Sequence, residues 1–188
     1  MKLQKIENQN KIELANCQNI GMFCKKFNAV MIFKKYHKVN TVKKAINDDY
    51  IKLSQIKKKF GQESVEAYLA VLILNLNESL NIIRKLTNNQ ISEIAAFIYD
   101  DYYFLNLAEL NLFFSRIKKG FYGQLYEGID IVKIMDFFAQ YKKERNNYLD
   151  SRNGQINLEN SMSMQERLNF FVVGLKAHAK AIEKIGLS

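Results

Sequence analysis

The sequence predicts an all-α protein, and three observations support this fold class. The chain of 188 residues contains no proline, where a usage of roughly 5% would give about nine. Its eight glycines are also few. Turns between strands use both residues often, whereas helices joined by short connections need few of them. Apolar residues recur at helical spacing along most of the chain. We therefore expect a compact bundle of about seven helices around a buried central helix, 63–84.

The first third of the chain begins as a polar stretch and then becomes helical. Residues 1–19 are rich in asparagine and weakly periodic. From Ile20 the pattern is amphipathic, with apolar positions at Ile20, Phe23, Cys24, Phe27, Val30 and Met31. Thr41 is expected to cap one further short helix, and Ser54 a second one that ends at Gly61.

The middle of the chain predicts three helices. The predicted helix 63–84 contains AYLAVLILNLN, which is apolar nearly all round and typical of a helix buried on most sides. Two capping boxes then mark helix starts, Thr87 with Gln90 and Asn106 with Glu109. The two helices that follow are short and close together, so they predict a helical hairpin. The second is expected to end at Gly120.

The last part of the chain predicts two helices separated by a linker. Asp130 is expected to cap the first helix. Residues 146–160 are polar and resemble a linker. Ser163 with Glu166 forms a third capping box, and the helix after it carries apolar residues at Leu168, Phe171, Val172 and Leu175.

The positive charge is concentrated at one end. Residues 1–60 hold 14 lysines and 4 acidic residues, whereas residues 61–188 hold 14 basic and 15 acidic residues. We therefore distinguish a basic N-terminal helical segment, 1–60, from a near-neutral helical body, 61–188, within one compact domain. Such asymmetry favours an anionic partner, nucleic acid being the commonest. The alternative is the lysine usage of an AT-rich genome, although that bias acts along the whole chain.

One loop combines cations, aromatic residues and glycines. Residues 116–126 read RIKKGFYGQLY. Cations bind phosphates, and aromatic rings stack on exposed bases of single strands. The predicted nucleic-acid contacts are Lys25, Lys26, Lys34, Lys35, Lys57, Lys58, Arg116, Lys118, Lys119 and Tyr122. Two alternatives stay open for the loop. In the first, Gly120 ends a helix and Phe121, Tyr122 and Tyr126 pack beneath the loop. In the second, the loop contacts a protein partner.

Motifs of catalysis and of metal binding are not found. The sequence has neither common phosphate-binding glycine motif, and it has no HExxH or GxSxG. Two cysteines and two histidines are too few for an expected metal site. We therefore predict no catalytic residue, no metal and no cofactor. An enzyme would need a pocket that gathers Asp100, Asp101, Arg116 and tyrosines.

Part of the chain resembles an uncharacterised family. The stretches AYLAVLILNLNESLNI (67–82) and ISEIAAFIYDDYYFLNLAELNLFFSRIKKGFYGQLYEGID (91–130), with the helix up to residue 146, are similar to proteins of Bacteroidota and of their phages and mobile elements. The similarity covers residues 50–150, roughly. It implies a phage or mobile-element origin and the cytoplasm of a bacterial host. No mechanism follows from it, because the family has no assigned catalytic residues.

These observations lead to one expected function and one alternative. The first is a non-enzymatic accessory protein of phage or mobile-element DNA metabolism, which binds nucleic acid non-specifically. The nucleic acid that this hypothesis expects includes single strands. A replication or host protein is a further expected partner, and no membrane is involved. The alternative is a protein-interaction or assembly module, either a virion component or an inhibitor of a host protein. Its contact surface would be an exposed aromatic segment, Tyr99–Leu105.

Overall fold

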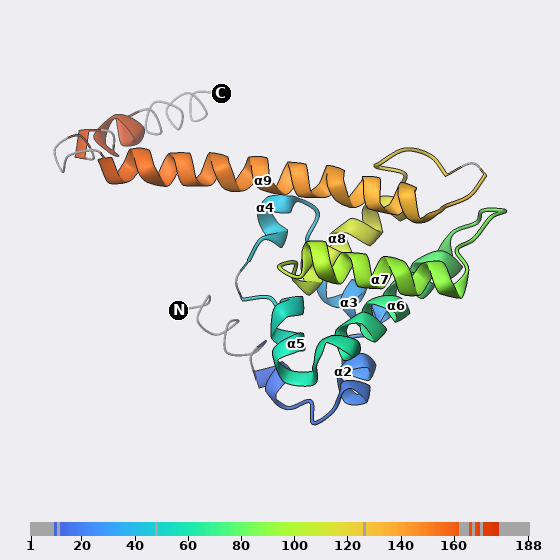
Figure 1. Ribbon diagram of the computed structural model, residues 1–188. Helices are drawn as coiled ribbons and strands as arrows, with labels where there is room; N and C mark the ends of the chain where they lie inside the picture. The colour runs from blue at the N-terminus through green and yellow to red at the C-terminus, as the bar shows by residue number, and fades with distance from the viewer. Residues whose placement is uncertain are drawn as a thin grey trace, which may run out of the picture. The chain divides into compact units, whose positions relative to one another are not determined.

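The computed structural model describes residues 10, 12–47, 49–125, 127–161, 166, 168, 169 and 171–176, where its regular elements are helices (Figure 1). Extended pairing there is limited to two isolated bridges, so the all-α fold class is confirmed. The chain divides into two compact units, residues 1–145 and 146–188. The helices are α2 (Ile20–Lys26), α3 (Ala29–Tyr36), α4 (Val42–Ala45), α5 (Leu53–Phe60), α6 (Gln62–Ser79), α7 (Asn88–Tyr102), α8 (Leu107–Lys118) and α9 (Ile131–Ser161).

Short helices with polar caps form the N-terminal segment. The side chain of Asn28 accepts a hydrogen bond from the Met31 N–H at 3.0 Å. This cap divides the amphipathic stretch into α2 and α3, where the sequence pattern predicted one helix. The Thr41 cap of α4 is confirmed. The Ser54 cap is wrong, because α5 begins one residue earlier and the Lys52 N–H bonds to the side chain of Gln55 instead.

The predicted helix 63–84 is too long at its C-terminal end. Helix α6 ends at Ser79, and Leu80 is extended. The cause is the side chain of Asn77, which donates to the Leu86 carbonyl at 3.0 Å and accepts from the Leu86 N–H at 2.9 Å. These two bonds turn the chain back, so that α7 lies alongside α6 (Figure 1).

Helix α8, and not α6, is the most buried helix of the first unit. Every residue from Leu107 to Phe114 is buried. Helix α6 leaves Val71 and Leu74 exposed on one side. Helix α8 packs against α3, α4 and α6, and its Phe113 ring stacks on Phe138 of α9 with ring centroids 3.7 Å apart. The centre of the bundle is therefore the second helix of the predicted hairpin.

Both capping boxes of the middle region are confirmed. Asn106 also links distant segments, since its amide donates to the Ala45 carbonyl at 2.9 Å. Next to it, the Leu53 N–H bonds to the Leu105 carbonyl and the Leu107 N–H to the Ile51 carbonyl. Residues 20–60 therefore pack into the same unit as α6–α8, and the predicted division at residue 60 remains a distinction of charge.

The predicted linker 146–160 is wrong, because α9 runs straight through it. This stretch has no proline, and its single glycine, Gly154, does not end the helix. The Asp130 cap is confirmed by a 2.8 Å hydrogen bond from the Lys133 N–H. The boundary between the two units still falls after Arg145. In the third predicted capping box, Ser163 lies outside the described residues.

The aromatic segment Tyr99–Leu105 places three of its seven residues in the core, so it does not form the continuous exposed patch that the alternative function required. Tyr99, Tyr102 and Leu105 are each 6% exposed or less. Tyr99 and Tyr102 lie three residues apart on one face of α7, and Tyr102 packs on Phe138 at 4.9 Å between ring centroids. Tyr103 is exposed at the turn that follows.

Candidate functional site: a groove between α3, α6 and α8

Two side chains of the predicted contact loop, residues 116–126, interact with other residues of the protein. The Arg116 guanidinium makes two hydrogen bonds to the Glu144 carboxylate, at 2.6 and 3.0 Å, and its side chain is 11% exposed. It also lies 4.4 Å from the centroid of the Phe121 ring. The Tyr122 ring stacks on Phe137 at 5.2 Å, and burial raises the pKa of its hydroxyl. Tyr126 lies outside the described residues.

A second charged pair lies deeper in the same joint between α8 and the first part of α9. Glu109 is 1% exposed and accepts from Arg145 Nε at 2.7 Å. The Tyr141 hydroxyl donates to the same oxygen at 3.3 Å, and the Asn106 N–H to the other oxygen at 3.2 Å. Burial raises the pKa of Glu109 in spite of the neighbouring Arg145. The capping box predicted Glu109, but nothing in the sequence indicated its partner.

A groove opens on another side of α8. It is a cavity of about 390 Å³ between α3, α6 and α8. Its walls are largely apolar and include Val30, Phe33, Leu72, Leu76 and Phe114. Phe33 is 54% exposed, so its ring is open to a ligand. The volume falls within the ~300–1,000 Å³ of pockets that bind small ligands.

A line of polar residues runs along the α8 side of the groove. Asn111, Ser115, Lys118 and Lys119 follow i, i+4, i+7, i+8 spacing, and all four line the cavity. Asn111 is 7% exposed, yet its side-chain amide forms no hydrogen bond with any described residue. Neither lysine makes an ion pair within the described part of the chain. The amide atoms of Asn111 are reachable from the cavity, so this side chain can form hydrogen bonds to a ligand there.

The two lysines of this groove were predicted from the sequence as ligand contacts, whereas Asn111 was not. Asn111 lies in the run Leu110–Phe114, which is otherwise apolar and entirely buried. A polar residue inside such a run is a signal that sequence reading can use. The opposing residues from α3 and α6 are far away in the chain, and only the fold brings them together.

The predicted N-terminal lysines gather at the ends of the short helices. Each of α2–α5 has two or three lysines in its last turn and no acidic residue in its first. The amino groups of Lys26 and Lys35 both lie over the Phe27 ring, at 5.9 and 5.3 Å. Lys35 pairs with Glu13. Lys59, which was not among the predicted contacts, donates to the carbonyls of residues 14 and 15 at 2.7 and 2.6 Å.

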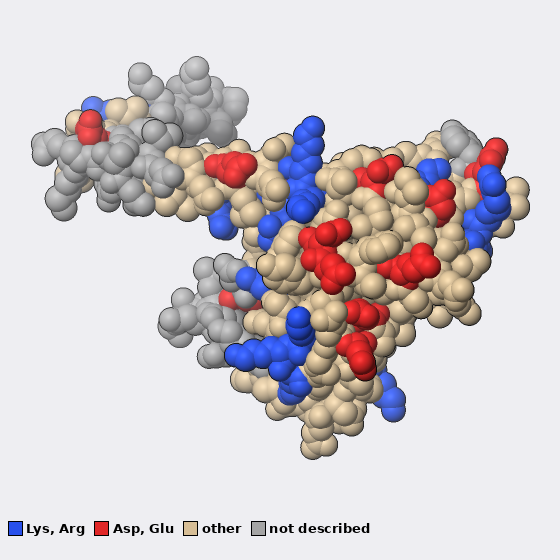
Figure 2. All heavy atoms as spheres, viewed as in Figure 1, with Lys and Arg blue, Asp and Glu red and all other residues tan. Residues whose placement is uncertain are grey.

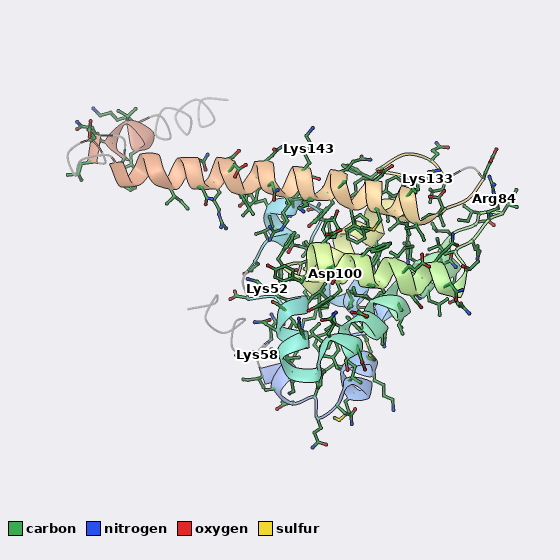
Figure 3. The ribbon with its side chains drawn as sticks, in the orientation of Figure 1. Lys52, Lys58, Arg84, Asp100, Lys133 and Lys143 are labelled. Carbon is green, nitrogen blue, oxygen red and sulfur yellow. The ribbon has the colours of Figure 1, made fainter. Side chains whose placement is uncertain are left out.

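The other four predicted N-terminal lysines are not among those that lie over the Phe27 ring. Lys57 lies over the Tyr99 ring at 5.0 Å, whereas Lys25, Lys34 and Lys58 are exposed. On the face drawn in Figure 2, basic side chains gather beside α5, and acidic side chains lie over α6 and α7. Figure 3 places Lys58 on α5 and Asp100 on α7. The predicted cations therefore form more than one group, separated in part by acidic surface.

A second cavity, of about 620 Å³, differs from the groove because its lining is more polar and includes an ion pair. Arg84 and Lys133, which lie at the same end in Figure 3, line it together with Glu127. Arg84 donates to Glu127 at 2.7 Å. The backbones also meet here, since a Cβ added to Gly128 would lie 2.7 Å from the Arg84 Cβ. This cavity marks a junction of two chain segments.

The acidic candidates for catalysis do not meet in either cavity. Asp100 and Asp101 are exposed on α7, and Arg116 is held by Glu144. Neither the groove nor the second cavity includes any of the three. Within the described residues, no group of three or more His, Cys, Asp or Glu side chains is placed to hold a metal ion.

The helices in the described ranges are too short or too polar to span a bilayer.

These features define a class: an all-α protein whose first unit holds a largely apolar groove with a line of polar residues on one side. Residues 85–169 match the model of a family of unknown function (DUF6633). The match spans α7, α8 and α9, and it leaves α2–α6 outside. The predicted resemblance, over residues 50–150, is confirmed in part: the match overlaps it at residues 85–150 and concerns a family of unknown function. Comparisons with curated proteins and with solved structures gave no match.

Proposed function

We propose that this protein is a non-enzymatic accessory protein of phage or mobile-element DNA metabolism, which binds nucleic acid non-specifically. The observation that carries the proposal is the charge of four consecutive helices, since α2–α5 all end in lysines and begin without an acid. Lys25, Lys34 and Lys58 are exposed and make no ion pair with a described residue. Phosphates bind such cations without regard to sequence. The genetic origin follows from the family resemblance by analogy.

The structure narrows the set of contacts that supports this proposal. Arg116 and Tyr122 are left out, because the first is paired with Glu144 and the second is stacked on Phe137. Lys118 and Lys119 stay, because they are exposed and unpaired in the described part of the chain. The proposed contacts are thus the N-terminal lysines and the lysine end of the groove.

Fluorescence anisotropy with labelled single- and double-stranded DNA over a salt series tests the proposal. We expect the triple variant Lys25→Gln/Lys34→Gln/Lys58→Gln to bind more weakly, with the salt slope on single strands reduced by about 0.7 for each lost phosphate contact. The matched control is Lys85→Gln/Lys142→Gln/Lys143→Gln, which removes the same charge from exposed positions of the body. The proposal fails if wild type does not bind at low salt, or if the control weakens binding as much as the test variant.

One observation favours a second candidate, a protein-interaction or assembly module. In the second unit, Leu168, Phe171, Val172 and Leu175 follow i, i+3, i+4, i+7 spacing and are 45–67% exposed. An apolar helical stripe without cover is typical of a surface that binds another protein. A virion component or an inhibitor of a host protein would use it in this way.

Pull-down from a host lysate with and without nuclease separates the two candidates. A partner that survives nuclease and is lost in Phe171→Ser/Leu175→Ser supports the module. A partner that nuclease removes supports nucleic-acid binding, with the protein retained only through DNA or RNA.

A further inference from the structure

The polar groups of the groove favour a ligand that can form hydrogen bonds in its interior. Asn111 is nine-tenths buried, and its amide lacks a partner among the described residues. Its polar atoms are reachable from the cavity, so a bound ligand with a donor and an acceptor would form hydrogen bonds to them. The ligand must also have apolar surface, because Val30, Phe33, Leu72 and Phe114 form the walls.

The lysines at one end of the groove fix the charge of the ligand. Lys118 and Lys119 follow Asn111 by seven and eight residues on α8, which is about two helical turns. Both line the same cavity as Asn111. A ligand that fills the groove therefore carries negative charge beside the part that reaches Asn111.

Three kinds of ligand meet these requirements to different degrees. An acyl chain with an anionic head would fill the walls, but it presents nothing to the Asn111 amide. A partner helix has its backbone groups bonded internally and would need a side chain at that point. A nucleic-acid base has apolar faces for Phe33, a polar edge for an amide, and phosphates on either side.

We propose that the groove binds an unstacked base of a single-stranded nucleic acid. The base stacks on Phe33, its edge bonds to the Asn111 amide, and the flanking phosphates contact Lys118 and Lys119. This inference rests on the proposed nucleic-acid function and specifies it, since it names single strands as the preferred partner. It also replaces Tyr122, which the sequence predicted as the stacking residue, with Phe33.

The test compares two strands that differ only in their bases. One is a labelled oligothymidylate of about 12 nucleotides, and the other has the same phosphates on abasic tetrahydrofuran units. We expect wild type to bind the oligothymidylate about tenfold more tightly, which is the scale of one stacked base. In Phe33→Ala and in Asn111→Leu this ratio should fall towards one, with the salt slope unchanged.

Control variants separate the base from the phosphates. Asn89→Leu makes the same chemical change at an exposed position outside the groove, and it should keep the wild-type ratio. Lys118→Gln/Lys119→Gln should weaken the binding of both strands and lower the salt slope by about 0.7 for each lysine. Thermal unfolding of each variant checks that it is folded.

The possible outcomes distinguish this inference from the function on which it rests. If wild type binds both strands equally, the groove does not take a base, while phosphate binding by the protein survives. If wild type binds neither strand at low salt, both proposals fail. Photocrosslinking with 5-iododeoxyuridine gives an independent result. A crosslink on Phe33 supports the inference, and crosslinks found only outside the groove overturn it.

Discussion

Two sides of helix α8 use similar side chains in opposite ways. Towards α9, Glu109 bonds to Arg145 and Arg116 bonds to Glu144, so every charge has a partner. Towards α3 and α6, Asn111, Lys118 and Lys119 line a cavity and have none among the described residues. We call the first side the paired joint and the second the open groove.

A cation that is held in an internal ion pair differs from a cation that can bind a ligand. Arg116 and Lys118 are two residues apart, and in sequence they form part of one basic cluster. Helical positions two residues apart point to nearly opposite sides of the helix, so one side chain enters the joint and the other reaches the groove. Pairing, and not charge alone, therefore decides which cation can meet a ligand.

The largest effect that we expect comes from breaking the paired joint. Glu109→Ala leaves the Arg145 guanidinium, which is 15% exposed, without its carboxylate. It also removes the acceptor of the Asn106 N–H and of the Tyr141 hydroxyl. Loss of one partner of a buried ion pair costs about 3–5 kcal/mol of unfolding free energy. Urea denaturation followed by circular dichroism measures it, and a loss below about 1 kcal/mol would show that the joint is not structural.

A smaller loss is expected at the outer pair of the joint. Arg116→Ala removes two hydrogen bonds to Glu144, which is 42% exposed and can return to water. We expect a loss of about 1.5–3 kcal/mol, as for hydrogen bonds to a charged group. The binding of single-stranded DNA should change little, because Arg116 is occupied within the protein. A variant that loses most of its DNA affinity while keeping its stability would reverse the assignment of this arginine.

The sequence was sufficient where local chemistry decides the structure. The boxes at Thr87 and Asn106 and the cap at Asp130 are contained within a few residues, and all three are present. The helix end at Ser79 was missed because Asn77 bonds to Leu86, nine residues later. The linker at 146–160 was wrongly predicted because polar composition indicates exposure, and an exposed helix is equally polar.

The groove was beyond sequence reasoning for a different reason. Phe33, Leu72 and Asn111 come from three helices that are separated by more than thirty residues in the chain, and no local pattern connects them. The basic cluster at 116–119 was found, but periodicity alone does not tell which of its cations has a partner. The partners Glu144 and Glu109 are only identified once α9 is packed against α8.

A change of opposite sign is expected in the open groove. Asn111→Leu replaces an amide that has no hydrogen bond to a described residue with an apolar side chain of similar size, which packs on the apolar walls of the groove. We expect the unfolding free energy to rise by about 0.5–1 kcal/mol, while the preference for strands with bases is lost. Urea denaturation measures the first quantity and anisotropy the second. A destabilisation of more than about 1 kcal/mol would mean that the amide has a structural role.

The smallest effect concerns pH and belongs to Lys118. Partial burial lowers the pKa of its ammonium below the ordinary lysine value. A bound phosphate stabilises the charged form, so the pKa rises on binding and the complex takes up protons in the window between the two values. Affinity for single-stranded DNA should therefore fall as pH rises through this window.

Lys118→Arg provides the control for this pH dependence. Arginine keeps its charge throughout the alkaline range, so the variant should bind with an affinity that changes less with pH. Anisotropy titrations between about pH 7 and 10, at constant ionic strength, would measure both proteins. Parallel curves for wild type and variant would place Lys118 outside the phosphate contact and leave the open groove with Lys119 as its cation.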